Sequence, residues 1–322
     1  MKGLVIRGSR NIFTVQIEAD GEVDAGTVTR KEIECRFKGK ILKEAEGVYN
    51  PLAPGDMVIV EFNPNHAGTG QIIALEKRRN VFSRFNQKGG TPQLLAANAD
   101  LVLCLTTAAS PPFRPRFLDR VLLQADTAGI PPLVICNKSD LNIDDLDVEE
   151  RLEEFHRLGY RVLRISAKTG EGLDELRELI AGKCSVLIGQ SGVGKSSLIN
   201  VLLRDSRVRE GAINEKYDRG NHTTTMSLMV ELSENGNKPT RLIDTPGIRR
   251  FVPDGISAEE LVLHMREFAP LAGTCTYGLS CSHRVEPGCK IMEAVAAGVI
   301  HEDRYNSFLR IYDELAGKKH AG

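Results

Sequence analysis

The sequence contains no apolar run near the roughly 20 residues that a membrane-spanning helix requires. Its opening residues, MKGLVIRGSR, lack the apolar core of a secretory signal peptide. The formal net charge is only -1, with 42 Lys and Arg against 43 Asp and Glu, so the chain as a whole is not a polycation. We therefore expect a cytoplasmic protein with no membrane partner. Any binding of nucleic acid would depend on local basic patches such as EKRRNVFSR (76–84).

A chain of 322 residues is long enough for two or three domains, and its 41% apolar and 26% charged residues are typical of soluble globular proteins. Residues 1–75 contain short alternating runs such as IFTVQIE and DMVIVEF, separated by glycine, proline and charged residues. This spacing predicts an all-β domain, for which a small barrel of the OB type is favoured. An SH3-like barrel or a sandwich stays open.

Residues 76–98 are basic and polar, and we expect them to form a linker. From residue 99 to residue 250, apolar runs typical of buried strands alternate with helical patterns. This alternation predicts an α/β domain whose largely parallel sheet carries helices on both faces. Residues 251–322 are expected to form a mostly helical C-terminal domain. One of its helical patterns, SAEELVLHMREF, opens with Ser257 and Glu260 at the spacing of a capping box.

The segment GQSGVGKS (189–196) follows an apolar strand-like run and precedes a helical pattern, which is the context of a phosphate-binding loop. Glycines allow the tight turns that aim backbone N–H groups at phosphate oxygens. Lys195 is expected to contact the β- and γ-phosphates, and the Ser196 hydroxyl to bind Mg²⁺. The nucleotide-binding residues expected here are Gly189, Gln190, Ser191, Gly192, Val193, Gly194, Lys195, Ser196 and Ser197.

Two later segments complete the expected phosphate side. LIDTPG (242–247) ends an apolar run, so Asp244 is placed to hold the Mg²⁺ shell and Gly247 to donate its N–H to the γ-phosphate. RGNHTTT (219–225) is polar and is expected to act as a switch loop, in which Thr223 or Thr224 reaches Mg²⁺.

The guanine side is expected to precede the phosphate loop. In NKSD (137–140), the Asp140 carboxylate can accept two hydrogen bonds from the guanine N1–H and 2-amino group, a pair that adenine does not offer. Asn137 can bond guanine N7 and tie this loop to others, and Lys138 can lie across the base. SAKTG (166–170) follows another strand-like run, and it would bring Ser166, Ala167 and Lys168 near the guanine oxygen.

The order of these segments is base, base, phosphate, first switch, second switch. Ligands of open α/β sheets bind at the carboxyl ends of the strands, and the order of connection does not alter that crevice. The sequence therefore predicts a circularly permuted GTPase domain, with new ends between DTPG and NKSD.

Cysteine is scattered except at CTYGLSCSHRVEPGC, which holds Cys275, Cys281, His283 and Cys289. Three thiolates and one imidazole form a closed tetrahedral Zn²⁺ set. The segment has little apolar content, so a bound metal would explain how it folds. We expect one structural zinc ion.

These motifs, in this order and over nearly the whole chain, resemble the RsgA (YjeQ/YloQ) family of circularly permuted GTPases. The resemblance implies a GTPase of late small-subunit (30S) ribosome maturation, which binds the subunit and its rRNA, hydrolyses GTP to GDP there with Mg²⁺, and dissociates. Five residues separate Cys275 from Cys281, one more than is usual in that family.

Hydrolysis is expected to be slow in the isolated protein. Many GTPases place a glutamine directly after the DTPG-type glycine to orient the attacking water, and Ile248 stands there. The resemblance implies that His222 takes over this role when the small subunit docks; a packing or RNA contact is the alternative for His222. Two other functions stay open: a GTP-dependent switch for another RNA cargo and a non-hydrolysing RNA-binding scaffold. A monomer is the default expectation.

Overall fold

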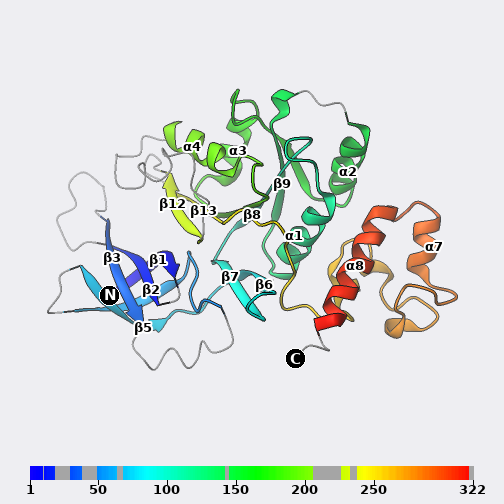
Figure 1. Cartoon of the computed structure of the whole chain (residues 1–322), viewed down its shortest axis with the longest axis horizontal. Helices are drawn as coiled ribbons and strands as arrows, with labels where there is room; N and C mark the ends of the chain where they lie inside the picture. Colours follow the sequence, from blue (N-terminus) through cyan, green and yellow to red (C-terminus); the bar gives the residue numbers. More distant parts are fainter. Residues whose placement is uncertain are drawn as a thin grey trace.

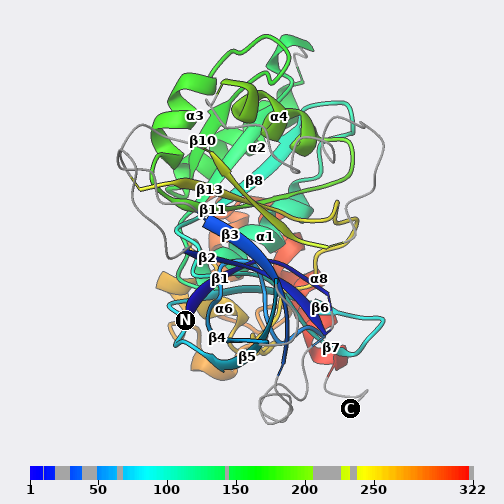
Figure 2. The same ribbon diagram turned by 90° about the vertical axis from the view of Figure 1, so that its left-hand side faces the viewer.

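The computed structural model describes residues 1–9, 11–18, 30–37, 49–63, 68–141, 145–205, 226–232 and 238–318. These residues form a barrel, a β-hairpin, an α/β domain and a helical C-terminal module (Figure 1). Figure 2 views the molecule from the barrel side and shows the α/β domain above both the barrel and the C-terminal module. Among these residues, no helix has the length and apolar content needed to span a bilayer.

The first five strands close into a barrel. β1 pairs antiparallel with β2 and β4, β2 with β3, and β4 with β5, whereas β3 and β5 run parallel. Inward-facing residues at alternate positions, such as Phe13, Val15 and Ile17, fill the barrel. The predicted five-stranded OB-like barrel is confirmed. Its strands are β1 (Lys2–Ser9), β2 (Ile12–Glu18), β3 (Arg30–Phe37), β4 (Met57–Phe62) and β5 (Thr69–Leu75).

The segment 76–98, expected to be a linker, contains a β-hairpin instead. Its strands β6 (Val81–Asn86) and β7 (Thr91–Ala97) form a separate two-stranded sheet. Phe82 and Leu95 are buried in the same apolar cluster as the first helix of the α/β domain. The hairpin is therefore part of the domain packing. The charged run EKRR (76–79) directly before the hairpin, together with Arg84 and Lys88, made the segment look like a polar linker in the sequence.

The α/β domain is built on the strand order β10-β9-β8-β11-β13-β12. The first five strands in this order are parallel, and β12 is antiparallel to β13. The predicted largely parallel sheet is confirmed. The strands are β8 (Leu101–Thr107), β9 (Pro132–Asn137), β10 (Arg161–Arg164), β11 (Cys184–Gly189), β12 (Leu228–Leu232) and β13 (Thr240–Asp244).

Helices cover both faces of this sheet. Along β8, Val102 and Cys104 pack in one apolar cluster while Leu103 and Leu105 pack in another, because successive side chains point to opposite faces. The first cluster includes α1 and α2, and the second includes α3 and α4 (Figure 1). These helices are α1 (Pro115–Thr127), α2 (Leu146–Arg157), α3 (Leu173–Ile180) and α4 (Lys195–Asp205).

The C-terminal module contains α6 (Leu261–His264), α7 (Lys290–Ala296) and α8 (Glu302–Lys318). The predicted capping box forms: Glu260 N–H donates to Ser257 Oγ at 3.2 Å, and Ser257 N–H donates to Glu260 Oε2 at 3.2 Å. The helical pattern over 257–268 nevertheless yields only the short α6. Met265 is extended, with φ -97° and ψ 124°, and the chain turns there so that Met265 and Phe268 enter the core of the module.

Candidate nucleotide site and metal centre

The segments expected to bind nucleotide follow four parallel strands of one sheet. NKSD comes at the end of β9, SAKTG after β10, the phosphate loop after β11 and TPG after β13. The carboxyl ends of parallel strands share one edge, so the fold brings these segments to one edge despite their order in the chain.

Asn137 holds three of these segments together. Its Nδ2 donates to the carbonyl oxygen of Val193 in the phosphate loop at 2.9 Å, and its Oδ1 accepts from the N–H of Ala167 at 3.1 Å. The side chain is only 2% exposed, so both hydrogen bonds lie away from water. The phosphate loop also packs tightly against this amide, since a Cβ at Gly194 would lie only 2.3 Å from Asn137 Nδ2.

Asp140 is held by the SAKTG segment. The Ser166 hydroxyl donates to Asp140 Oδ1 at 2.7 Å, and Lys168 Nζ lies 3.7 Å from Oδ2. The hydrogen bond from Ser166 is the main cause that lowers the pKa of Asp140 below its usual range. The carboxylate is therefore ionised at neutral pH and acts only as an acceptor, which is the state that a guanine edge requires.

Lys138 also contacts a loop that none of the sequence motifs predicts. Its Nζ donates to the carbonyl oxygens of Gly192 at 2.9 Å and of Ser110, which lies after β8. A Cβ at Gly192 would lie 3.6 Å from Pro111 of the same loop. The signal that could have found this loop is its place after a parallel strand, because the loop after β8 lies at the same sheet edge as the others.

The phosphate loop connects β11 to α4 through two glycines in the left-handed region, Gly192 at φ +84° and Gly194 at φ +97°. Lys195 is 8% exposed, and its ammonium donates to the carbonyl oxygens of Gly189 at 2.8 Å and Gln190 at 3.0 Å. Burial lowers the pKa of Lys195, and the nearby Asp244 carboxylate opposes that shift. The ammonium thus lies inside the phosphate loop, near Asp244 at the end of β13.

Asp244 and Ser196 carry oxygen atoms of the kind that can bind magnesium. Asp244 is 1% exposed at the carboxyl end of β13, and Ser196 is exposed in the first turn of α4. A carboxylate and a hydroxyl are oxygen donors of the type that Mg²⁺ prefers. Gly247 packs against Ser191 of the phosphate loop, where a Cβ would come within 3.2 Å.

Ile248 points away from this edge. Its side chain is 2% exposed and lies in the apolar cluster with Phe251, while its N–H donates to Gly189 O at 3.3 Å. This position therefore supplies no group that could orient water. The predicted switch residues His222, Thr223 and Thr224 lie outside the described residues.

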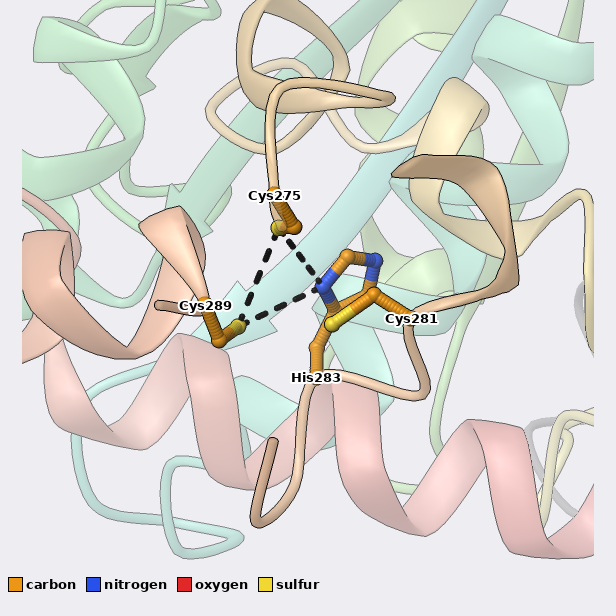
Figure 3. A group of neighbouring side chains, drawn as sticks. All are labelled: Cys275, Cys281, His283 and Cys289. Carbon is orange, nitrogen blue, oxygen red and sulfur yellow. Dashed lines mark hydrogen bonds between the residues drawn. The ribbon is translucent and has the colours of Figure 1, made fainter. Parts of the chain in front are cut away.

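The four predicted metal ligands converge in the C-terminal module (Figure 3). Their ligand atoms all lie within 4.8 Å of one another, and all four residues are buried. Cys275 Sγ is 3.6 Å from His283 Nδ1 and 3.9 Å from Cys289 Sγ, and Cys289 Sγ is 3.5 Å from the same nitrogen. Tetrahedral bonds to zinc would separate such atoms by roughly 3.5–3.8 Å. The donor set and its spacing therefore fit a four-coordinate metal ion.

Neighbouring groups orient this cluster. The Lys290 N–H donates to Cys275 Sγ at 3.3 Å, and the Tyr305 hydroxyl donates to the carbonyl oxygen of His283 at 2.7 Å. A short 3₁₀ turn, Gly278–Ser280, lies between Cys275 and Cys281, and the Cys275 thiol lies in the cluster with the other three ligand atoms.

Comparison with known proteins gives one consistent answer. The sequence profile described as RsgA GTPase matches residues 75–252. The chain is 39% identical over 293 residues to the small ribosomal subunit biogenesis GTPase RsgA of Chlorobaculum parvum, covering 88% of this chain and 91% of that protein. Identity to the protein of the same name from Borrelia recurrentis is 37%, over 97% and 93%. The chain belongs to the RsgA GTPase family.

Solved structures extend the RsgA-family likeness beyond the matched domain. The crystal structure of YjeQ from Thermotoga maritima superposes with a TM-score of 0.69 at 29% identity, over 98% of each chain. The crystal structure of YloQ, described as a circularly permuted GTPase, shares the fold with a TM-score of 0.63 at 22% identity, over 98% of this chain and 95% of that one. The predicted fold, permuted domain included, is confirmed.

Proposed function

We propose that this protein hydrolyses GTP during maturation of the small ribosomal subunit: it binds the subunit and its rRNA, cleaves GTP there and dissociates. Membership of the RsgA family and the printed names of the relatives support this proposal. The observation that carries the GTP assignment is the ionised Asp140, held by Ser166 on a loop that Asn137 ties to the phosphate loop. We further propose that the protein acts as a monomer in the cytoplasm.

On the guanine side, Asp140 accepts hydrogen bonds from the base, Lys138 flanks the base, and Ser166, Ala167 and Lys168 form the wall near the guanine oxygen. Asp140→Asn should weaken GTP binding at least about a hundredfold, because the amide places a donor against the donors of guanine. Xanthosine triphosphate, which carries a carbonyl at position 2, should be bound better by this variant than by wild type. Fluorescent-nucleotide competition measures both, with Asp174→Asn as the exposed control. Unchanged GTP affinity would remove Asp140 from the site.

On the phosphate side, the loop residues 189–197 would surround the β- and γ-phosphates, and Lys195 would supply a positive charge. Ser196 and Asp244, with Thr223 or Thr224, would hold Mg²⁺, which neutralises charge on the β- and γ-phosphates when bound. Gly247 would donate its N–H to the γ-phosphate. The contact of Gly247 with Ser191 supports this assignment, because it brings the second switch to the phosphate loop.

Intrinsic hydrolysis should be slow and should rise when small subunits are added. The buried Ile248 supports this expectation, since it leaves the orientation of water to another residue, which we propose is His222. The test is phosphate release with and without small subunits, for wild type and His222→Ala. We expect His222→Ala to lose about 10²–10⁴-fold of the stimulated rate while it keeps GTP affinity. Equal stimulated rates would exclude His222 from the hydrolytic step.

In the C-terminal module, we propose that Cys275, Cys281, His283 and Cys289 hold one structural zinc ion. All four positions of a tetrahedral set would come from the protein, so no position would remain for substrate. Metal analysis of the purified chain should give one zinc per chain, and a clearly lower ratio would contradict this assignment.

A further inference from the structure

A pocket of about 500 Å³ lies beside the phosphate loop. Its wall is formed by the start of α1, the segment after the second switch and α8 of the C-terminal module. Among the described residues that line it, Gln190 alone comes from the segments expected to bind nucleotide. The residues that matter to its chemistry are Phe113, Arg114, Arg116, Gln190, Arg249 and Asp303.

The pocket is strongly cationic. Five arginines line it, against the single carboxylate of Asp303. Two of the five, Arg120 and Arg250, are paired with Glu314, and Arg116 lies 3.8 Å from Asp303. Arg114 and Arg249 are exposed, and neither side chain has an ion pair or hydrogen bond within the part of the chain that the structure describes. These two guanidinium groups keep their full donor capacity for an anion.

Two further features of the pocket favour an anion: the N-terminus of α1 and the Gln190 side-chain amide. α1 begins in the pocket with Arg114 at its N-cap, with no side-chain cap and no acidic residue in its first turn. The N-terminus of a helix favours an anion. Independently, Gln190 is 8% exposed, and its Nε2 has no hydrogen-bond partner among the described residues. A buried amide donor without a partner is costly, and an acceptor in the pocket could satisfy it.

Two residues that line the pocket lie within or close to segments of the expected nucleotide site. Gln190 directly follows Gly189, and Arg249 is two residues after Gly247. The hydrogen bond from Ile248 N–H to Gly189 O, at 3.3 Å, joins the two segments between those residues. An anion held by Arg249 and Gln190 would therefore contact both the phosphate loop and the end of the second switch.

We propose that this pocket binds a backbone phosphate of RNA, with Arg114 and Arg249 as its main contacts. The inference rests on the proposed function, which supplies an RNA-containing partner. RNA is favoured over a small phosphate compound because the two unpaired guanidinium groups are exposed at the surface, where a chain running past the pocket reaches both. The partly buried Phe113 beside them offers an aromatic face to a neighbouring base.

The test compares Arg114→Gln/Arg249→Gln with Arg161→Gln/Arg204→Gln. Both double variants remove two exposed arginines of the α/β domain, but the second pair does not line the pocket. Each full-length protein is titrated into a labelled single-stranded oligoribonucleotide at several salt concentrations. In parallel, it is sedimented with small subunits in the presence of a non-hydrolysable GTP analogue.

The pocket variant should bind RNA about tenfold more weakly than wild type. The slope of log K against log salt should fall by about 0.7, the value for one phosphate contact on a single strand. The control variant should stay within about twofold of wild type. Both variants should keep the affinity of wild type for labelled GDP. Equal losses in the two variants, or no loss in the pocket variant, would overturn the proposal.

The two arms separate this proposal from the proposed function. If wild type binds the oligonucleotide but no small subunits, the ribosomal function fails, and the difference between the variants still decides the pocket. If wild type binds subunits but not the oligonucleotide, the sedimentation of the two variants decides whether the pocket binds RNA. If wild type binds neither, the proposal for the pocket is refuted. A third measurement is thermal unfolding with inorganic phosphate. Stabilisation that the pocket variant loses, together with unchanged RNA binding, would assign the pocket to free phosphate and overturn the RNA assignment.

Discussion

The α/β domain is joined to the barrel and to the C-terminal module in two different ways. At the barrel, β1 and β12 share the bridge pair Arg7 and Leu228, and the ion pair between Arg30 and Glu231 is partly open to water, each side chain being 27% exposed. At the C-terminal module, Arg304 donates to Asp119 at 2.6 Å and to Glu267 at 2.6 Å, and all three side chains are at most 5% exposed. The β1–β12 contact thus depends on backbone pairing and a partly exposed ion pair, whereas the C-terminal junction depends on buried charge.

This difference predicts different sensitivity to substitution. Exposed ion pairs contribute little because water and salt screen them. A buried ion is expensive to leave without its partner, so removal of one member of a buried network costs far more than the pair itself contributes. The C-terminal junction should therefore be intolerant of single changes, and the β1–β12 contact tolerant of them.

The largest expected effect is removal of the metal ion. Cys275, Cys281 and Cys289 belong to the apolar core of the C-terminal module, so the proposed zinc would hold that core together. Structural zinc sites bind with apparent free energies on the order of 10 kcal/mol. Chelation, or Cys281→Ser, should therefore abolish hydrogen-exchange protection over residues 269–296 and leave residues 1–75 protected.

Cys184→Ser is the matched control for metal loss, since this partly exposed thiol lies outside the cluster. It should keep the metal content of wild type. Unchanged exchange in the C-terminal module after complete metal loss would show that its core does not depend on the ion.

The second largest effect is expected at Asp119, whose carboxylate accepts hydrogen bonds from Arg304, Arg151 and the Ser307 hydroxyl. Asp119→Ala would leave Arg304 and Arg151 buried without this shared carboxylate, and it should destabilise the protein by about 3–5 kcal/mol. Because the chain contains no tryptophan, circular dichroism in urea is the suitable readout. Limited proteolysis should then release the C-terminal module first.

Asp174→Ala is the comparison for Asp119→Ala. Asp174 also pairs with an arginine, but its side chain is 97% exposed, so the change should cost less than about 0.5 kcal/mol. Similar midpoints for the two variants would mean that burial of the Asp119 network does not govern the junction.

The contrast between the junctions also separates what sequence could predict from what it could not. The placement of Asn137 and Asp140 at the end of a strand could be predicted because a strand followed by a short motif fixes local geometry. Helices α1 to α4 and α8 could be predicted from local periodicity. Asp119 and Arg304 are 185 positions apart, and nothing near either residue in the sequence indicates its partner. The Ser110 loop and the β6–β7 hairpin were missed because their roles arise from tertiary packing. The proposed nucleotide-binding roles of Asn137 and Asp140, like those of His222, Thr223 and Thr224, stay predictions.

The smallest effect is expected at the barrel junction. Arg30→Gln removes one partner of Glu231, which still accepts a hydrogen bond from Arg241 at 3.1 Å. The partial exposure of both charges limits the loss to about 0.2–1 kcal/mol, and salt should reduce it further. Urea unfolding at low and high salt measures this loss. A loss as large as that of Asp119→Ala, insensitive to salt, would contradict this contrast, because it would mean that water does not reach the charges at the β1–β12 contact.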